Sequence, residues 1–259
     1  EDSKRSASDE FALRHYEENT RFENGKYVVS LPWKDNCDLL NDNRESAIFR
    51  NEQLERSLEK NPIKKELYCD AMNEYIKLGL AEEVPESELY DETKRIRYLP
   101  HHGIFREDKT TTKMRPVFDA SSKSKGEVSL NDCLHTGPDL MPNILSIILR
   151  FRYYQVALVS DVSRMYNSFM LNPEDRNSHR FIWRNCETSS EPKTYRMVCV
   201  TFGVGTSGFL AEATVHKHCD DHAKEYVVKC INDSIPGVSI PLNELIKEST
   251  YMDDVITGR

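Results

Sequence analysis

The chain has 259 residues, 38% of them hydrophobic and 30% charged, which is typical of a globular protein with a sizeable core. No apolar run approaches the roughly 20 residues of a membrane helix and the first residues lack a signal-peptide pattern, so we expect no membrane partner and no secretion. The net charge of -8 argues against attachment to nucleic acid by overall charge alone. The sequence does not begin with Met, so we expect a piece of a longer protein.

The first third of the chain predicts an arm, a strand and two helices. Residues 1–21 are polar with little periodicity and are expected to be a linker or a disordered arm. Gly25–Trp33 has the composition of a short strand that Pro32 ends. Apolar residues at helical spacing on both sides of Asn61-Pro62 then predict two helices with core-facing stripes.

Residues 97–105 and 113–119 predict two paired strands joined by a polar turn at 109–112. Between Lys94 and Lys125 basic residues far outnumber acidic ones, which fits a phosphate-facing surface or, equally well, a solvated face. His101 and His102 are neighbours on a strand and point to opposite faces, which argues against a shared metal.

An apolar helix is predicted at residues 140–151, where Leu and Ile dominate, and it is expected to be largely buried. The apolar run 155–160 follows and predicts a buried strand that ends at Asp161. A carboxylate at the end of a buried strand is costly unless it has a partner or a task, so Asp161 is a candidate functional residue.

Residues 181–184 and 194–200 predict another strand pair, and the glycine-containing loop 203–208 leads into a helix at 209–224. The glycine spacing does not match the dinucleotide-binding fingerprint. Residues 227–245 are expected to be irregular. Four residues of metal-ligating type on the predicted helix spread around its circumference, which argues against zinc: His216, His218, Cys219 and His222. The seven scattered cysteines, never spaced C-x-x-C, predict free thiols.

Strand-forming residues flank Asp253-Asp254 and predict a tight hairpin with this acidic pair at its tip. At roughly 5 Å and an effective dielectric of about 20, two such charges repel by about 3 kcal/mol, so the arrangement favours a divalent cation. A solvated acidic turn is the alternative. Together with Asp161, the pair matches two-metal phosphoryl transfer, for which Mg²⁺ is suited because it prefers oxygen ligands.

These residues carry a resemblance to reverse transcriptases. Tyr251-Met252-Asp253-Asp254 resembles the Y-x-D-D box of that family, and residues 160–166 resemble its D-x-x-x-x-[FY] motif. Residues 202–211 are similar to its loop and helix below the templating base. Residues 98–102, 111–121, 129–132 and 137–138 resemble the BEL/Pao class of LTR retrotransposon polyproteins. Gly208 and Phe202 depart from the usual residues of BEL/Pao and retroviral enzymes, respectively.

The resemblance implies an α+β right-hand polymerase with fingers and a partial palm (an antiparallel sheet with helices) and without a thumb. It divides the chain into the arm 1–21, an N-terminal helical extension 22–92, fingers with the first part of the palm 93–153, and a palm 154–259 that ends after the hairpin. It also implies two Mg²⁺ ions, with Mn²⁺ as a substitute, on Asp161, Asp253, Asp254 and the Val162 carbonyl. The implied nucleotide contacts are Lys109, Lys113, Arg115, Tyr166 as a gate against the ribose 2'-hydroxyl, Phe202, Gly203, and Met252 at the primer end.

By the same resemblance the chain is an RNA-directed DNA polymerase, a nucleotidyltransferase, that is inactive or weakly active as this piece alone. Its implied partners are an RNA template, a DNA primer, dNTPs, and the rest of a Pol polyprotein with protease, ribonuclease H and integrase. Its expected location is intracellular, in cytoplasmic virus-like particles or the nucleus. The alternatives are a degenerate retroelement remnant that binds nucleic acid or a partner without catalysis, and an RNA-dependent RNA polymerase, which Tyr166 and Tyr251-Met252 disfavour.

Overall fold

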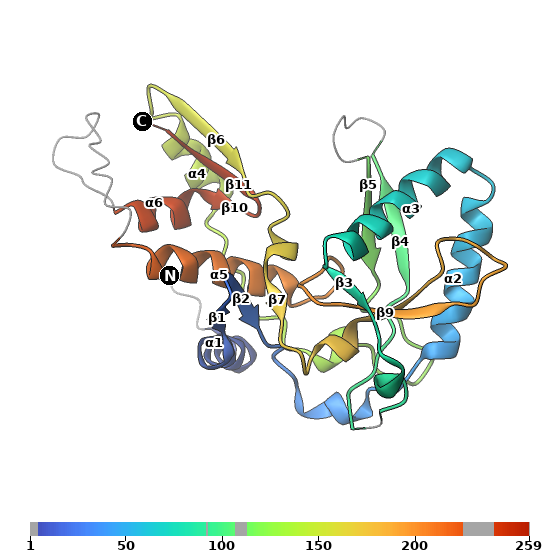
Figure 1. Ribbon diagram of the computed structural model, residues 1–259. Helices are drawn as coiled ribbons and strands as arrows, with labels where there is room; N and C mark the ends of the chain where they lie inside the picture. The colour runs from blue at the N-terminus through green and yellow to red at the C-terminus, as the bar shows by residue number, and fades with distance from the viewer. Residues whose placement is uncertain (1–4, 92, 107–112, 225–240, 259) are drawn as a thin grey trace. The chain divides into compact units, whose positions relative to one another are not determined.

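The computed structural model describes residues 5–91, 93–106, 113–224 and 241–258, and these form an α+β structure (Figure 1). The chain folds as two compact units. The first comprises Glu1–Gly137 and Tyr166–Ser207, and the second comprises Pro138–Met165 and Gly208–Arg259. None of the described helices is long and apolar enough to cross a membrane. The division into arm, helical extension, fingers and palm, with boundaries at residues 22, 93 and 154, is based on function and not on compactness, and it stays a prediction.

Helix α1 (Ala7–Asn19) occupies most of the segment that was expected to be a linker or a disordered arm, so the segment is not disordered from Ala7 onward. Ser6 caps the helix: its hydroxyl accepts the backbone N–H of Asp9 at 3.1 Å, while the Asp9 carboxylate accepts the Ser6 N–H at 3.3 Å. Ala12 and Tyr16 lie four residues apart and are both buried. The helix was missed because this stripe of one residue per turn gives little periodic signal in a polar sequence.

The described strands of the first unit form small sheets. In the first sheet β2 lies between β1, which pairs antiparallel, and β7, which pairs parallel. The other two sheets are entirely antiparallel, in the orders β3-β9-β8 and β4-β5. The bounds are β1 Arg21–Glu23, β2 Lys26–Val29, β3 Ala81–Glu83, β4 His101–Phe105, β5 Met114–Phe118, β7 Met170–Leu171, β8 Arg180–Trp183 and β9 Lys193–Met197. The predicted strand pairs β4-β5 and β8-β9 are thus confirmed.

Helices α2 (Arg44–Leu58) and α3 (Pro62–Lys77) confirm the two helices predicted around Asn61-Pro62. The Asn61 side chain accepts the Lys64 N–H at 3.1 Å, and Pro62 takes the first helical position, where its missing N–H costs nothing. Short 3-10 helices connect the longer elements of this unit: η1 Asp35–Leu39, η2 Glu86–Glu88, η3 Asn131–Cys133, η4 Tyr166–Ser168 and η5 Arg176–His179.

The core between α3 and strands β4, β5 and β8 is built around His101. Its Nδ1 accepts the Tyr68 hydroxyl at 2.5 Å, and its Nε2–H donates to the Ile182 carbonyl at 2.9 Å. Burial lowers the pKa of His101 to about 4, so the ring is neutral. His102, the next residue on the strand, is exposed, as the alternation of strand side chains predicts.

The second unit contains one antiparallel sheet in the order β10-β11-β6, and helices α4 and α6 pack against β11. Helix α5 leads into this unit from Ser207 and confirms the predicted helix after the glycine-containing loop. The bounds are α4 Ile144–Phe151, β6 Ala157–Asp161, α5 Ser207–Asp221, α6 Leu242–Ser249, β10 Thr250–Tyr251 and β11 Asp254–Gly258.

Three expectations for the second unit are corrected. Strand β6 is exposed along its length, with Val159 67% exposed. Among the described residues it is an edge strand, and helices α4 and α6 pack against β11. Helix α4 buries only Ile147, whereas Leu145 is 60% exposed, so α4 is not largely buried. The end of the segment 227–245, expected to be irregular, belongs to α6; residues 225–240 lie outside the described part of the chain.

Candidate acidic metal-binding site

Three carboxylates meet at one end of the β10-β11-β6 sheet. Asp161 is the last residue of β6, and Asp254 is the first residue of β11, directly opposite it in the antiparallel register. Asp253 precedes Asp254 in the turn from β10. One oxygen of each carboxylate lies within 4.8 Å of the other two, which brings together the three aspartates that were predicted from positions far apart in the sequence.

The turn between β10 and β11 is tight, as expected, but its tip lies one residue earlier. Tyr251 pairs with Asp254, which leaves Met252 and Asp253 as a two-residue turn, so the tip is Met252-Asp253 and not Asp253-Asp254. Met252 has a φ of 56°, in the left-handed region that non-glycine residues adopt mainly in such turns. The cost of this conformation is of order 1–3 kcal/mol and must be offset by neighbouring contacts.

A backbone hydrogen bond supplies one such contact and fixes Asp253 beside the end of β6. The N–H of Val162 donates to the Asp253 carbonyl at 2.6 Å. The Val162 carbonyl, which was predicted to be a metal ligand, accepts the Met165 N–H at 3.2 Å and keeps a second lone pair. The predicted ligand role of this carbonyl is therefore compatible with the local geometry, but it is not tested by it.

The electrostatics of the cluster favour a cation. Like charges directly opposite each other on paired strands are destabilising, and here a third carboxylate joins them. Asp161 and Asp254 are exposed, and Asp253 is half-buried, so the oxygens are accessible from solvent. Three accessible carboxylates suit Mg²⁺ or Mn²⁺, which take oxygen ligands and retain waters.

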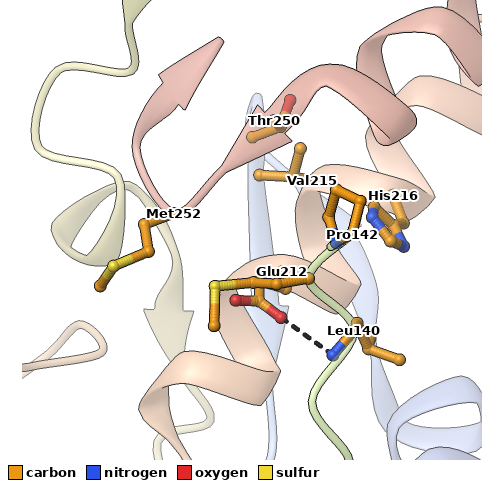
Figure 2. A pocket seen from close by; sticks show the side chains of 8 residues that line it. Leu140, Pro142, Glu212, Val215, His216, Thr250 and Met252 are labelled. Atoms are coloured by element: carbon orange, nitrogen blue, oxygen red, sulfur yellow. Dashed lines mark hydrogen bonds between the residues drawn. The ribbon is translucent and has the colours of Figure 1, made fainter. Parts of the chain in front are cut away.

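Behind the turn lies a mostly apolar pocket that also contains a carboxyl group (Figure 2). Its lining residues are Leu140, Met141, Pro142, Glu212, Val215, His216, Thr250 and Met252. Glu212 accepts the Leu140 N–H at 3.2 Å, and burial raises its pKa to about 7. Sequence reasoning missed Glu212, although an acid among Leu210, Ala211 and Ala213 is a signal of a buried carboxyl group.

Three of the predicted nucleotide-binding residues gather in the first unit. The rings of Tyr166 and Phe202 lie 4.5 Å apart between centroids. Gly203 follows with a φ of 101°, and a Cβ at this position would lie 1.9 Å from the Phe118 carbonyl oxygen, so only glycine fits. The Phe118 N–H donates to the Phe202 carbonyl at 3.2 Å and fixes the loop to the end of β5.

The predicted triphosphate contacts lie on the β4-β5 hairpin of the first unit. Arg115 on β5 and Lys113 just before it are both exposed, so their charged groups are available to a ligand. Lys109 lies outside the described residues. Met252, predicted to face the primer end, is 42% exposed on the second unit and also lines the pocket behind the turn. These roles remain predictions.

Among the described residues, Cys219 and the histidines in and just after α5 do not converge as a second group of metal ligands. Among the residues that the structure describes, the three aspartates are the only group of three or more His, Cys, Asp or Glu side chains whose ligand atoms converge. The ring centroids of His218 and His222 lie 4.2 Å apart, but these two histidines do not belong to any such group of three converging ligands among the described residues. The described cysteines are free thiols, as expected.

No protein-family model matches the chain, and no curated protein sequence matches it. Among solved structures, it is similar to a foamy viral protease-reverse transcriptase in complex with double-stranded DNA, with 16% sequence identity and a TM-score of 0.46. The similarity covers 71% of this chain and 24% of that chain, so this chain spans about a quarter of the other's length.

Proposed function

We propose that this chain is the fingers and partial palm of an RNA-directed DNA polymerase, a reverse transcriptase from a BEL/Pao-type LTR retrotransposon. The observation that carries the proposal is the convergence of Asp161, Asp253 and Asp254 within 4.8 Å on two hydrogen-bonded strands. Converging carboxylates of this kind are what two-metal nucleotidyl transfer requires of the protein. The BEL/Pao assignment rests on the sequence motifs between residues 98 and 138.

In this proposal the aspartates hold two Mg²⁺ ions, which when bound would activate the primer 3'-hydroxyl and stabilise the leaving oxygen of pyrophosphate. The protein contributes rigidity. The antiparallel ladder between β6 and β11 sets the separation of Asp161 and Asp254, and the Val162 N–H fixes the turn that carries Asp253. Fixed ligands need no rearrangement when charge develops during the reaction.

The nucleotide would be held by residues of the first unit. Arg115 and Lys113, with Lys109, would bind the triphosphate, since a guanidinium can contact phosphate oxygens in a bidentate manner. Tyr166 would exclude a ribose 2'-hydroxyl, and its ring contact with Phe202 would limit the movement of the gate. Gly203 would leave the pocket floor without a side chain. Met252, exposed at the turn, would contact the primer end.

The proposed partners are an RNA template, a DNA primer, dNTPs and the remaining domains of a Pol polyprotein. The experiment uses a longer polypeptide in which this chain is followed by its natural downstream segment. We expect it to extend a DNA primer on an RNA template with Mg²⁺, and we expect Asp253→Asn to abolish extension. Asp139→Asn is the matched control, because Asp139 is an exposed aspartate of the same unit outside the cluster.

The outcomes separate the candidate functions. Extension by Asp253→Asn at the wild-type rate would show that the metal assignment is wrong. Template and primer binding without extension, in wild type as well as in the variant, would instead favour a retroelement remnant that binds nucleic acid without catalysis. A preference for ribonucleotides would contradict the role given to Tyr166.

A further inference from the structure

Two cysteines from distant parts of the first unit meet where α3 contacts the end of β8. The Cys69 thiol donates to the Asn185 carbonyl at 3.7 Å, and Asn73, one helical turn further along, donates from its side chain to that of Asn185 at 2.8 Å. Cys186 is the next residue after Asn185. Residues 69 and 73 share one face of α3, so this face is held against the turn that contains Cys186.

The backbone of that turn directs Cys186 inward. Asn185 and Cys186 have φ angles of 57° and 53°, two consecutive non-glycine residues in the left-handed region. Such residues are uncommon and their conformation is unfavourable unless surrounding contacts stabilise it. As a result Cys186 is only 2% exposed, whereas Cys69 is half-buried. The Cys69 sulfur thus lies beside the peptide bond that joins Asn185 to Cys186, and both thiols are free.

We propose that Cys69 and Cys186 are a redox-responsive thiol pair, which a peroxide oxidises to a disulfide that ties α3 to the turn after β8. The structure already provides what this reaction needs. The Cys69 sulfur lies 3.7 Å from the carbonyl oxygen of Asn185, the residue directly before Cys186. Cys69 is partly accessible from solvent, and Cys186 is shielded from it.

The order of the reaction follows from the surroundings of each thiol. Burial raises the pKa of both, to about 12 for Cys186, while the positive charge of Lys65 acts to lower both pKa values. Cys69 is the more exposed of the two thiols, so it meets the peroxide first and supplies the attacking thiolate. Its sulfur attacks one peroxide oxygen, and the O–O bond breaks to give a sulfenic acid and hydroxide. The hydroxide takes up the proton that the thiol released and becomes water. The Cys186 sulfur then attacks the Cys69 sulfur, the S–O bond breaks, and the thiol proton leaves with the hydroxide as water.

The disulfide would act on the element that supports the β4-β5 hairpin. Tyr68, adjacent to Cys69, donates its hydroxyl hydrogen bond to His101 on β4, and α3 packs against β5. The link would join Cys69 and Cys186 across more than a hundred intervening residues, and loops of this length lose much conformational freedom in the unfolded chain. Oxidation should therefore restrain α3 and slow amide hydrogen exchange in α3 and in the turn after β8.

The test oxidises the 259-residue chain with hydrogen peroxide, alkylates the remaining thiols and maps the peptides by mass spectrometry. We expect a Cys69–Cys186 linked peptide, loss of two alkylated thiols, and full reversal by dithiothreitol. Cys186→Ser should leave a sulfenic acid at Cys69 that dimedone traps, while Cys69→Ser should give neither product. Cys219→Ser is the control, since Cys219 lies in the second unit, and it should form the link as wild type does.

Binding of an arsenical to the wild-type protein tests the thiol pair without any substitution. Phenylarsine oxide binds two neighbouring thiols at once, so the unoxidised wild type should bind it and resist subsequent alkylation at both positions. Oxidised wild type in which Cys69 and Cys186 are both still alkylated, or linked to other cysteines, would overturn the proposal. Failure of wild type to bind the arsenical would overturn it as well.

Discussion

Asp161→Asn should stabilise the protein when no divalent cation is present. At 4.8 Å two unit charges repel by about 0.9 kcal/mol at the dielectric of water, and since Asp161 is exposed this lower limit applies. Asp253 and Asp254 are adjacent in the chain and repel in the unfolded state too, so folding adds only the two pairs that involve Asp161. Physiological salt roughly halves the sum of these two repulsion energies, so removing the Asp161 charge should stabilise the folded state by about 1 kcal/mol.

The same substitution should remove the stabilisation that a cation gives. A ligand that binds only the folded state at about 100 times its Kd adds about 2.7 kcal/mol to the free energy of unfolding. The wild type should gain this with Mn²⁺ while Asp161→Asn gains little, because one of three converging carboxylates is lost. The substitution thus raises Tm by about 2–4 °C without metal and lowers it relative to wild type with metal.

Differential scanning calorimetry with and without Mn²⁺ measures both effects, and isothermal titration measures binding directly. Asp139→Asn is the control, because its amide oxygen can still accept the Met141 N–H that the carboxylate accepts at 2.9 Å. It should change neither the metal-free Tm nor the shift with Mn²⁺. A metal-free Tm that falls in Asp161→Asn, or an Mn²⁺ shift equal to that of wild type, would refute the electrostatic reasoning.

Two further predictions concern stability. Gly203→Ala should destabilise the first unit by about 2 kcal/mol or more, measured by urea unfolding, because its Cβ would meet a backbone oxygen at 1.9 Å at a φ of 101°. Stability should also fall as pH is lowered from about 6.5 toward 4, because burial holds the pKa of His101 and His179 at about 4 and the unfolded chain binds their protons first. Glu212 acts in the opposite direction, because its pKa of about 7 means that the folded protein binds its proton first and gains stability as pH falls. One such group does not offset two buried histidines, so the urea midpoint should still be lower at pH 5 than at pH 7.

A matched variant and the direction of the pH effect check these two predictions. Gly205→Ala places a Cβ 3.4 Å from the nearest side-chain atom, at ordinary contact distance, and should cost less than about 1 kcal/mol. An equal loss in both glycine variants would contradict the argument from the close approach at Gly203. For the pH effect, a urea midpoint that rises on acidification would show that the buried histidines do not control the pH dependence.

Local sequence predicted the elements whose signals are local. The hairpin at 250–258 has strand-forming residues on both sides of its turn, and Asn61-Pro62 has the composition of a helix start, so both could be predicted without tertiary information. The aspartates were predicted as candidates for a physical reason as well, because each was costly in isolation. The α+β class followed from the same strands and helices.

Burial could not be predicted in the same way, because it depends on what covers an element. The apolar run of β6 and the Leu- and Ile-rich α4 have the composition of interior segments, yet β6 is at the edge of its sheet and α4 buries only Ile147. Hydrophobic periodicity reports which residues can be buried, and it contains no information on the neighbours that would bury them. Glu212 was missed for the same reason, because the burial that raises its pKa comes in part from the distant segment Leu140, Met141 and Pro142.

The position of the acidic site depends on the register of β11 against β6, and that register is restrained at the end opposite the aspartates. Asp254 faces Asp161 at one end of the ladder, and Gly258 faces Ala157 at the other. A Cβ on Gly258 would lie 2.4 Å from the Val156 carbonyl oxygen, so the two strands approach closely only because residue 258 has no side chain. A shift by one residue would bring Thr257 into this close approach and would turn the Asp254 side chain to the other face of the sheet. The glycine thus contributes to the geometry of carboxylates four residues away, although it touches none of them.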